Sequence, residues 1–156
     1  MPSRVAIAGH PLHAMLVNIP IGLWIFTLTS YVVFAITGDG RWAATGYFTL
    51  AGGIAGALLA ALPGLIDLLG LEEVRARRIG IFHMVLNLSI VVVQVINFFA
   101  ARAGSSLSLA LSALSVAALL VSGWLGGQLV HVLGVTQPSR TGATAPERER
   151  LDVRSR

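Results

Sequence analysis

The sequence predicts an all-α integral membrane protein, a four-helix bundle of up-down-up-down topology. The 156 residues are 55% hydrophobic and only 12% charged, whereas a soluble domain is usually about a quarter charged. Four apolar stretches are each long enough to cross roughly 30 Å of hydrocarbon as a helix. Short connections make consecutive helices antiparallel neighbours. We expect spans at Leu12–Thr37, Trp42–Leu69, Ile79–Ala101 and Leu107–Val130.

The first span follows the stretch "GHPLHAMLVN", residues 9–18. Pro11 suits the first turn of a helix, where a missing N–H group has little effect. Pro20 lies within the span and predicts a kink near Val17, which frees backbone carbonyl groups close to Asn18. The apolar run is too long for the core of a signal peptide, so we expect the first helix to insert the protein.

The second span carries small residues on one face. Such a stripe suits close helix packing, either inside the bundle or in a homodimer. Pro63 and Gly64 should bend this helix one turn before Asp67, the one carboxylate within a predicted span. The stripe runs through Gly52, Gly56, Ala60 and then Pro63 or Gly64.

The third and fourth spans carry polar stripes. On the third, polar residues recur at helical spacing and share one face, which should point into the bundle because a polar group facing lipid tails is costly. Interhelical hydrogen bonding alone would also explain the deeper residues. The stripe of the third span is His83, Asn87, Ile90, Gln94 and Asn97, and that of the fourth is Ser108, Ser112, Ser115, Ser122 and Gly126.

The arginines predict the orientation of the bundle in the inner membrane of a bacterium. All eleven basic residues are arginine, and we expect them to set topology rather than to bind nucleic acid. One side has Arg4, Arg75, Arg77, Arg78, Arg140 and the arginines that follow; the other has only Arg41 and Arg102. Both termini should therefore be cytoplasmic. Residues 1–136 would form the transmembrane domain and residues 137–156 a disordered, arginine-rich polar tail. No internal repeat is evident.

Titratable side chains gather at the predicted cytoplasmic end. His10 and His13 open the first span, Asp67 closes the second, His83 opens the third and His131 closes the fourth. The opposite end offers no comparable group. Four histidines and one carboxylate, drawn from all four spans, are thus expected in one membrane leaflet.

Such a layer suits several chemistries. The chain has no cysteine, which excludes thiolate sites, iron–sulfur clusters and covalently attached haem. Imidazole is the usual ligand of b-type haem, and His13 and His83 come from spans that lie diagonally in a four-helix bundle. They are the predicted haem ligands, with His10 and Asn87 in support. Met15 and Met84 offer thioether alternatives.

Two further interpretations stay open, and whether the protein is an enzyme is undecided. A non-haem transition metal could take His13, His83, His10 and Asp67, with His131 as a weaker member. Alternatively, the layer handles protons, or it only packs and anchors a structural or accessory membrane subunit. With no ligand at the opposite end, a haem would not form a relay across the membrane. It would exchange electrons at one face with a quinone or a protein partner.

Four segments together resemble an uncharacterised family of small bacterial membrane proteins, domain of unknown function 2231. They are "GHPLHAMLVNIPIG" at 9–22, "LPGLIDL" at 62–68, "RRIGIFHMVLN" at 77–87 and "GWLGGQLVHVLGV" at 123–135. The resemblance implies a four-helix membrane domain. Some relatives are joined to Rieske or cytochrome modules, which implies redox chemistry.

The resemblance also bears on single residues. His10, His13, Asp67, His83 and Asn87 match residue types of the family pattern. His131 stands where relatives usually have tyrosine, and Gln128 where some have histidine. The family label itself implies no activity.

Overall fold

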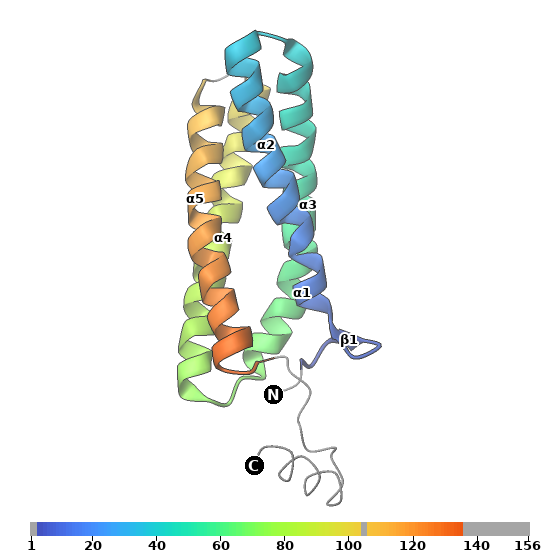
Figure 1. The fold of residues 1–156 in the computed structure, drawn as a ribbon, viewed down its shortest axis with the longest axis vertical. Helices are drawn as coiled ribbons and strands as arrows, with labels where there is room; N and C mark the ends of the chain where they lie inside the picture. The colour runs from blue at the N-terminus through green and yellow to red at the C-terminus, as the bar shows by residue number, and fades with distance from the viewer. Residues whose placement is uncertain (1–2, 104–105, 136–156) are drawn as a thin grey trace, which may run out of the picture.

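The computed structural model describes residues 3–103 and 106–135, and these form one bundle of long helices (Figure 1). Each of the four predicted spans is long and apolar enough to cross a membrane. The fold class predicted from the sequence is therefore confirmed. The helices are α1 (Leu12–Leu16) and α2 (Asn18–Thr37) in the first span, then α3 (Gly40–Leu69), α4 (Val74–Arg102) and α5 (Leu107–Gly127), which continues as the π-helix η1 (Gln128–Val132).

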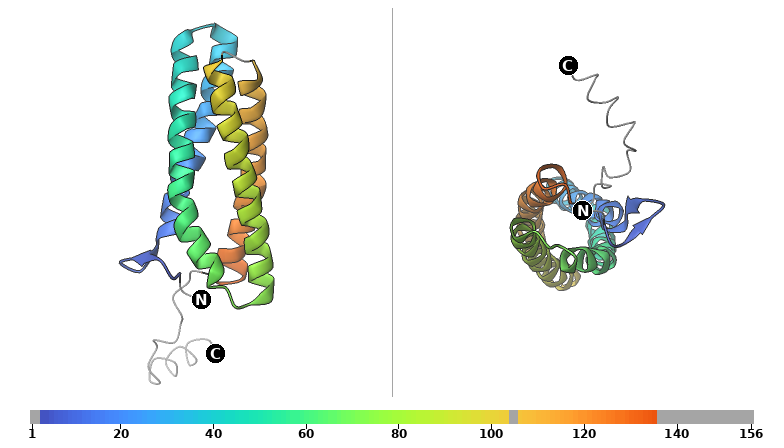
Figure 2. Two further views of the ribbon diagram at one scale, coloured as in Figure 1. Left: turned by 180° about the vertical axis from the view of Figure 1, so that it is seen from behind. Right: turned by 90° about the horizontal axis from the view of Figure 1, so that it is seen from below.

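Consecutive helices run antiparallel around the bundle. α2 packs against α3 and α5, and α4 packs against α5 and α3, so the first span lies diagonal to α4 (Figure 2). We call the end where α1 and α4 begin the histidine end. The opposite end, which carries the α2–α3 and α4–α5 connections, is the far end. The predicted tail, residues 137–156, lies outside the described residues.

Two helices begin earlier than the hydropathy predicted, because acidic side chains cap them. The carboxylate of Asp39 accepts a hydrogen bond from the backbone N–H of Arg41, 3.0 Å away, and α3 begins at Gly40. Glu73 caps the first turn of α4 in the same way, accepting from the N–H groups of Arg75 and Ala76. The connections are therefore shorter than predicted.

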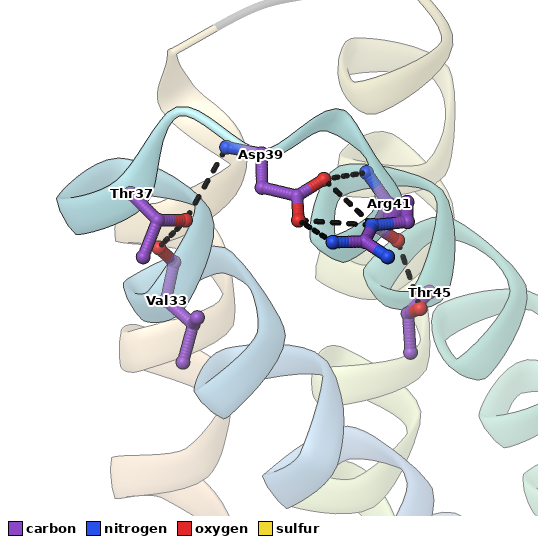
Figure 3. A network of polar contacts seen from close by, with 5 residues as sticks. All are labelled: Val33, Thr37, Asp39, Arg41 and Thr45. Carbon is purple, nitrogen blue, oxygen red and sulfur yellow. Dashed lines mark hydrogen bonds and ion pairs between the residues drawn. The ribbon is translucent and has the colours of Figure 1, made fainter.

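The α2–α3 turn is a compact polar network at the far end (Figure 3). Asp39 also binds the guanidinium of Arg41, with a shortest distance of 2.7 Å. The Thr37 hydroxyl donates to the carbonyl of Val33 and accepts from the N–H of Asp39. These local bonds end α2 and begin α3.

The first span breaks where Pro20 predicts it. α1 ends at Leu16 and α2 begins at Asn18, so the predicted kink near Val17 is confirmed. The side-chain amide of Asn18 lies 3.3 and 3.4 Å from the carbonyls of Ala14 and Met15 and satisfies part of the broken ladder.

Large side chains of α2 pack against glycines of α3. A Cβ atom on Gly53 would lie 2.3 Å from the Trp24 ring, and one on Gly46 would lie 2.6 Å from the Tyr31 ring. The indole N–H of Trp24 also donates to the carbonyl of Leu50 at 3.4 Å. Gly46 and Gly53 were not part of the predicted stripe; of that stripe, Gly56, Ala60 and Pro63 are buried, and a Cβ atom on Gly56 would lie 2.8 Å from Ile19 of α2.

The polar stripe of α4 points into the bundle, as predicted, and it faces the stripe of α5. The Asn97 amide donates to the Ser112 hydroxyl at 2.9 Å, and the Asn87 amide donates to the Ser122 hydroxyl at 2.6 Å. The contact positions on α4 are four and three residues apart, and those on the antiparallel α5 follow the same spacing in reverse. We call this line of contact between α4 and α5 the α4–α5 seam, and it runs from the histidine end to the far end.

Candidate functional site: a pair of histidines across the bundle

His13 is held against α3 by a backbone carbonyl. Its Nδ1 lies 2.8 Å from the oxygen of Ala60. Ala60 lies three residues before Pro63 in α3. Gly64 leaves room for the imidazole, since a Cβ atom there would lie 2.6 Å from Nδ1. Gly64 of the "LPGL" sequence therefore provides the space that the His13 ring occupies.

His83 is held against α5 in the same manner. Its Nδ1 lies 3.0 Å from the backbone oxygen of Ser122 and 3.2 Å from the hydroxyl of the same residue. Gly126 stands beside the ring, where a Cβ atom would lie 3.3 Å from Cε1. Close approach of α4 and α5 at Gly126 thus positions the imidazole.

The two histidines occupy equivalent places in two helical hairpins. In each hairpin a histidine near the start of the first helix binds a carbonyl of the second helix, Ala60 or Ser122. In each, a glycine follows that carbonyl residue by four positions. The two hairpins thus share one local arrangement of histidine, carbonyl and glycine.

The centres of the paired rings lie about as far apart as those of two histidines that bind one metal. Their centres lie 6.4 Å apart, with the planes at 89°. A metal bonded to two imidazole nitrogens at about 2.0–2.1 Å from each leaves the ring centres roughly 6 Å apart. Rings that share one ligation axis can take any angle about it. Perpendicular planes are therefore compatible with a single ion between His13 and His83.

Hydrogen bonding also selects the tautomer. A backbone carbonyl only accepts, so Nδ1 of each neutral ring carries the proton and Nε2 keeps its lone pair. Metal-binding histidines are usually oriented by such a bond from the second ring nitrogen. His13 and His83 are thus both arranged to bind a ligand through Nε2.

Asn87 contacts His83 from one turn deeper in α4. Its amide nitrogen lies 2.7 Å from the backbone oxygen of His83, 2.6 Å from the Ser122 hydroxyl and 3.3 Å from Nε2 of His83. An amide has two N–H bonds, and the two nearer oxygens occupy both. Asn87 therefore fixes the ring, and its contact with Nε2 of His83 is one that a ligand at this nitrogen would replace.

Two other predicted site residues lie at the same end, but their side chains form hydrogen bonds with the N-terminal segment. Asp67 accepts hydrogen bonds from the Ser3 hydroxyl and the Arg4 N–H, both at 2.8 Å. His10 is exposed in a short antiparallel hairpin, β1 (Ala6–Ile7) and β2 (His10–Pro11), where its Nδ1 lies 3.0 Å from the carbonyl of Ala8. Neither side chain joins the histidine pair.

The end of the fourth span contributes no third ligand. His131 is exposed in η1, and Met15 is exposed on α1. Within residues 3–103 and 106–135, no three His, Cys, Asp or Glu side chains come close enough to hold a metal together. Of the predicted layer, the structure brings together His13, His83 and Asn87.

Several residues that shape the site were not identified from the sequence. Gly64 and Gly126 make room for the rings, and the carbonyls of Ala60 and Ser122 orient them. The sequence placed Gly64 on the small stripe of the second span and Gly126 on the stripe of the fourth, but it linked neither glycine to a histidine. Backbone carbonyls occur at every position, so no residue type marks them.

Comparison with known proteins finds one family. A family described as "Predicted membrane protein (DUF2231)" matches residues 9–138, most of the chain. No curated protein matches, and no solved structure matches. The matched range includes both histidines, both glycines and the carbonyls that orient the rings.

Proposed function

The chain belongs to the DUF2231 family of predicted membrane proteins, and we propose that it is a membrane redox protein that binds one b-type haem between His13 and His83. The observation that carries the proposal is the imidazole pair, with ring centres 6.4 Å apart across the bundle. Each ring comes from a different helical hairpin, so the site exists only in the assembled bundle.

The number of ligands favours haem over a bare metal ion. A porphyrin supplies four nitrogens, so two histidines complete an octahedral iron. Structural and catalytic zinc sites, in contrast, use three or four protein ligands. Among the described residues no third His, Cys, Asp or Glu side chain accompanies His13 and His83.

The chain's own groups would hold and orient the cofactor. His13 and His83 would bind through Nε2, while the carbonyls of Ala60 and Ser122 keep each Nδ1 protonated. These hydrogen bonds raise ligand basicity and limit rotation of the rings. When bound, haem supplies one-electron chemistry. With one site at one end, electrons would be exchanged there with a quinone or a redox protein.

The test is the absorption spectrum of protein purified in detergent, with and without dithionite. We expect a Soret band that shifts on reduction and is lost in both His13→Ala and His83→Ala. His131→Ala is the matched control, because His131 lies at the same end but is exposed. Circular dichroism and gel filtration establish that each variant folds.

Three results would contradict the proposal. Colourless protein with one tightly bound transition metal indicates a non-haem site. Colourless, metal-free protein that gains no band when haem is supplied during expression, and that folds without both histidines, indicates an accessory subunit. A Soret band that survives both substitutions places the cofactor elsewhere.

A further inference from the structure

The chain enters the first span through the β-hairpin of β1 and β2. The two strands pair antiparallel, and Ala8 and Gly9 connect them. Both connecting residues have a positive φ, 50° and 79°, as in the type I′ turn of a two-residue hairpin. Residues 6–10 are all exposed. The β-hairpin therefore stands out from the bundle and is not packed into it (Figure 1).

The base of the β-hairpin is tied to two helices. Before β1, the Ser3 hydroxyl and the Arg4 N–H donate to the carboxylate of Asp67, in the last turn of α3. After β2, the N–H of Leu12, the first residue of α1, donates to the carbonyl of Val5 at 2.9 Å. Because both ends are attached, α1 and α3 determine the direction in which the β-hairpin points.

That direction is sideways from the bundle. The view along the bundle axis places the β-hairpin outside the ring of helices, and both side views place it nearer the middle of the bundle than the α3–α4 connection (Figure 1 and Figure 2). This connection leads directly into the exposed Arg75, Arg77 and Arg78, and arginines beside a span lie at the phospholipid headgroups. The β-hairpin therefore lies no farther from the membrane centre than the headgroups.

The tip of the β-hairpin is apolar. It consists of Ile7, Ala8 and Gly9, and Ile7 is 61% exposed. The first position of a type I′ turn favours asparagine, aspartate or glycine. Alanine stands there instead, and in the described part of the chain it is the one residue other than glycine with a positive φ. The composition of the tip thus suits lipid better than water.

Lipid already covers the apolar surface beside the β-hairpin. Met15 of α1 and Leu69 in the last turn of α3 are exposed apolar side chains at this end. Both belong to helices that are long and apolar enough to cross the membrane. The exposed Ile7 therefore continues a surface whose partner is the bilayer.

The backbone of the β-hairpin limits how deep the tip can lie. The outer edges of a two-stranded ribbon leave N–H and C=O groups without strand partners, and hydrocarbon offers them none. A lone two-stranded hairpin is also only marginally stable in water. The boundary between headgroups and acyl chains meets both requirements, because it hydrates the edges and buries an apolar tip.

We propose that the β1–β2 hairpin is a membrane-surface anchor, whose tip inserts between the phospholipids of the leaflet at the histidine end. Ile7 is the inserted side chain and contacts the upper part of the acyl chains. The strand edges bind water and headgroups. Insertion of the tip does not depend on haem, so this proposal and the proposed function can fail separately.

The first measurement uses the unaltered protein in phosphatidylcholine bicelles, with NMR of the isoleucine methyl groups. A phospholipid that carries a spin label near the top of its acyl chain should broaden the Ile7 signal strongly. A water-soluble gadolinium chelate should broaden it only weakly. Ile90 is the internal reference, because it is buried in the bundle and should be shielded from both reagents.

The second measurement compares two single cysteines, each carrying the same fluorescent probe, in phosphatidylcholine nanodiscs. Ile7→Cys places the probe on the tip. Glu72→Cys is the matched control, because Glu72 is exposed in the α3–α4 connection at the same end. Iodide in the water should quench the Glu72→Cys probe severalfold more than the Ile7→Cys probe. Spin-labelled phospholipid should quench the Ile7→Cys probe more.

Three results would overturn the anchor. An Ile7 methyl signal broadened by gadolinium but not by the lipid label places the tip in water. A signal shielded from both reagents, as for Ile90, shows that a second copy or another protein covers the tip. Equal quenching of the two probes by iodide contradicts insertion independently of the NMR result.

Discussion

At the residue scale, the site depends on two positions that have no side chain. Gly64 and Gly126 let α3 and α5 approach the imidazoles so that backbone carbonyls reach Nδ1 of each ring. The close approach of the helices at these glycines therefore determines which nitrogen of each ring carries the proton.

We predict that Gly64→Ala is more damaging than Gly126→Ala. The new Cβ would lie 2.6 Å from Nδ1 of His13 but 3.3 Å from Cε1 of His83. Overpacking of this kind typically destabilises by about 1–3 kcal/mol. The hydrogen bond to Ala60 restrains the His13 ring from moving away, so the loss for Gly64→Ala should lie in that range.

Thermal unfolding in detergent, followed by circular dichroism, measures the difference. Gly123→Ala is the control, because a Cβ on Gly123 meets nothing within 4 Å. It should be neutral or stabilising by about 0.5–1 kcal/mol, since alanine favours the helix. If Gly64→Ala behaves like Gly123→Ala, His13 is not held against α3.

At the element scale, the ends of the helices are set by local side-chain bonds. The Arg41 side chain, and secondarily its backbone N–H, hold the pKa of the Asp39 carboxylate below its ordinary value. A depressed pKa in the folded state means that the cap contributes stability at pH values above the ordinary aspartate range. That contribution is lost as the pH falls through the lowered pKa.

We therefore predict that the Asp39 carboxyl titrates at a lower pH than aspartate in an unfolded peptide. Carbon-13 NMR of the side-chain carboxyl measures it directly. Arg41→Gln removes the first and larger cause and should move the titration back toward the ordinary value. Identical titration in the wild type and in Arg41→Gln would show that the ion pair at this exposed turn has no effect on the carboxylate.

Hydropathy and periodicity predicted the helices and their inward faces well. Burial of Gln94 and Asn97 follows from helical spacing alone, and the break at Val17 follows from Pro20. The starts of α3 and α4 were placed too late, because Asp39 and Glu73 are charged and lower a hydropathy window while capping a helix.

The candidate site was predicted only in part. That His13 and His83 would meet follows from diagonal spans of known direction, and the rings do lie 6.4 Å apart. Asp67 and His10 were also predicted to lie beside these rings, but the structure does not bring their side chains to the pair. Two residues at the same depth in the membrane can point to different sides of their helices. Asp67 instead binds Ser3 and Arg4.

At the scale of the whole molecule, charge distinguishes the two ends of the bundle. Among the described residues, the histidine end carries Arg4, Arg75, Arg77 and Arg78, and the far end carries Arg41 and Arg102. Arginine-rich ends face the cytoplasm. The histidine pair is therefore predicted to lie in the cytoplasmic half of the membrane.

Single cysteines test this orientation directly, because the chain has none of its own. Glu72 and Ala103 are both exposed, in connections at opposite ends. In bacterial spheroplasts, a membrane-impermeant maleimide should label Ala103→Cys at once and Glu72→Cys only after permeabilisation. The reverse pattern would place the histidine end outside the cytoplasm.

The equivalence of the two hairpins has a consequence for how such a site can arise. Each hairpin carries one imidazole, one orienting carbonyl and one glycine. A two-fold pair of identical hairpins would present the same two rings across its axis. Outside this shared arrangement the hairpins differ, since α4 has Asn87, Gln94 and Asn97 at the spacing where the first span has Val17, Trp24 and Thr27.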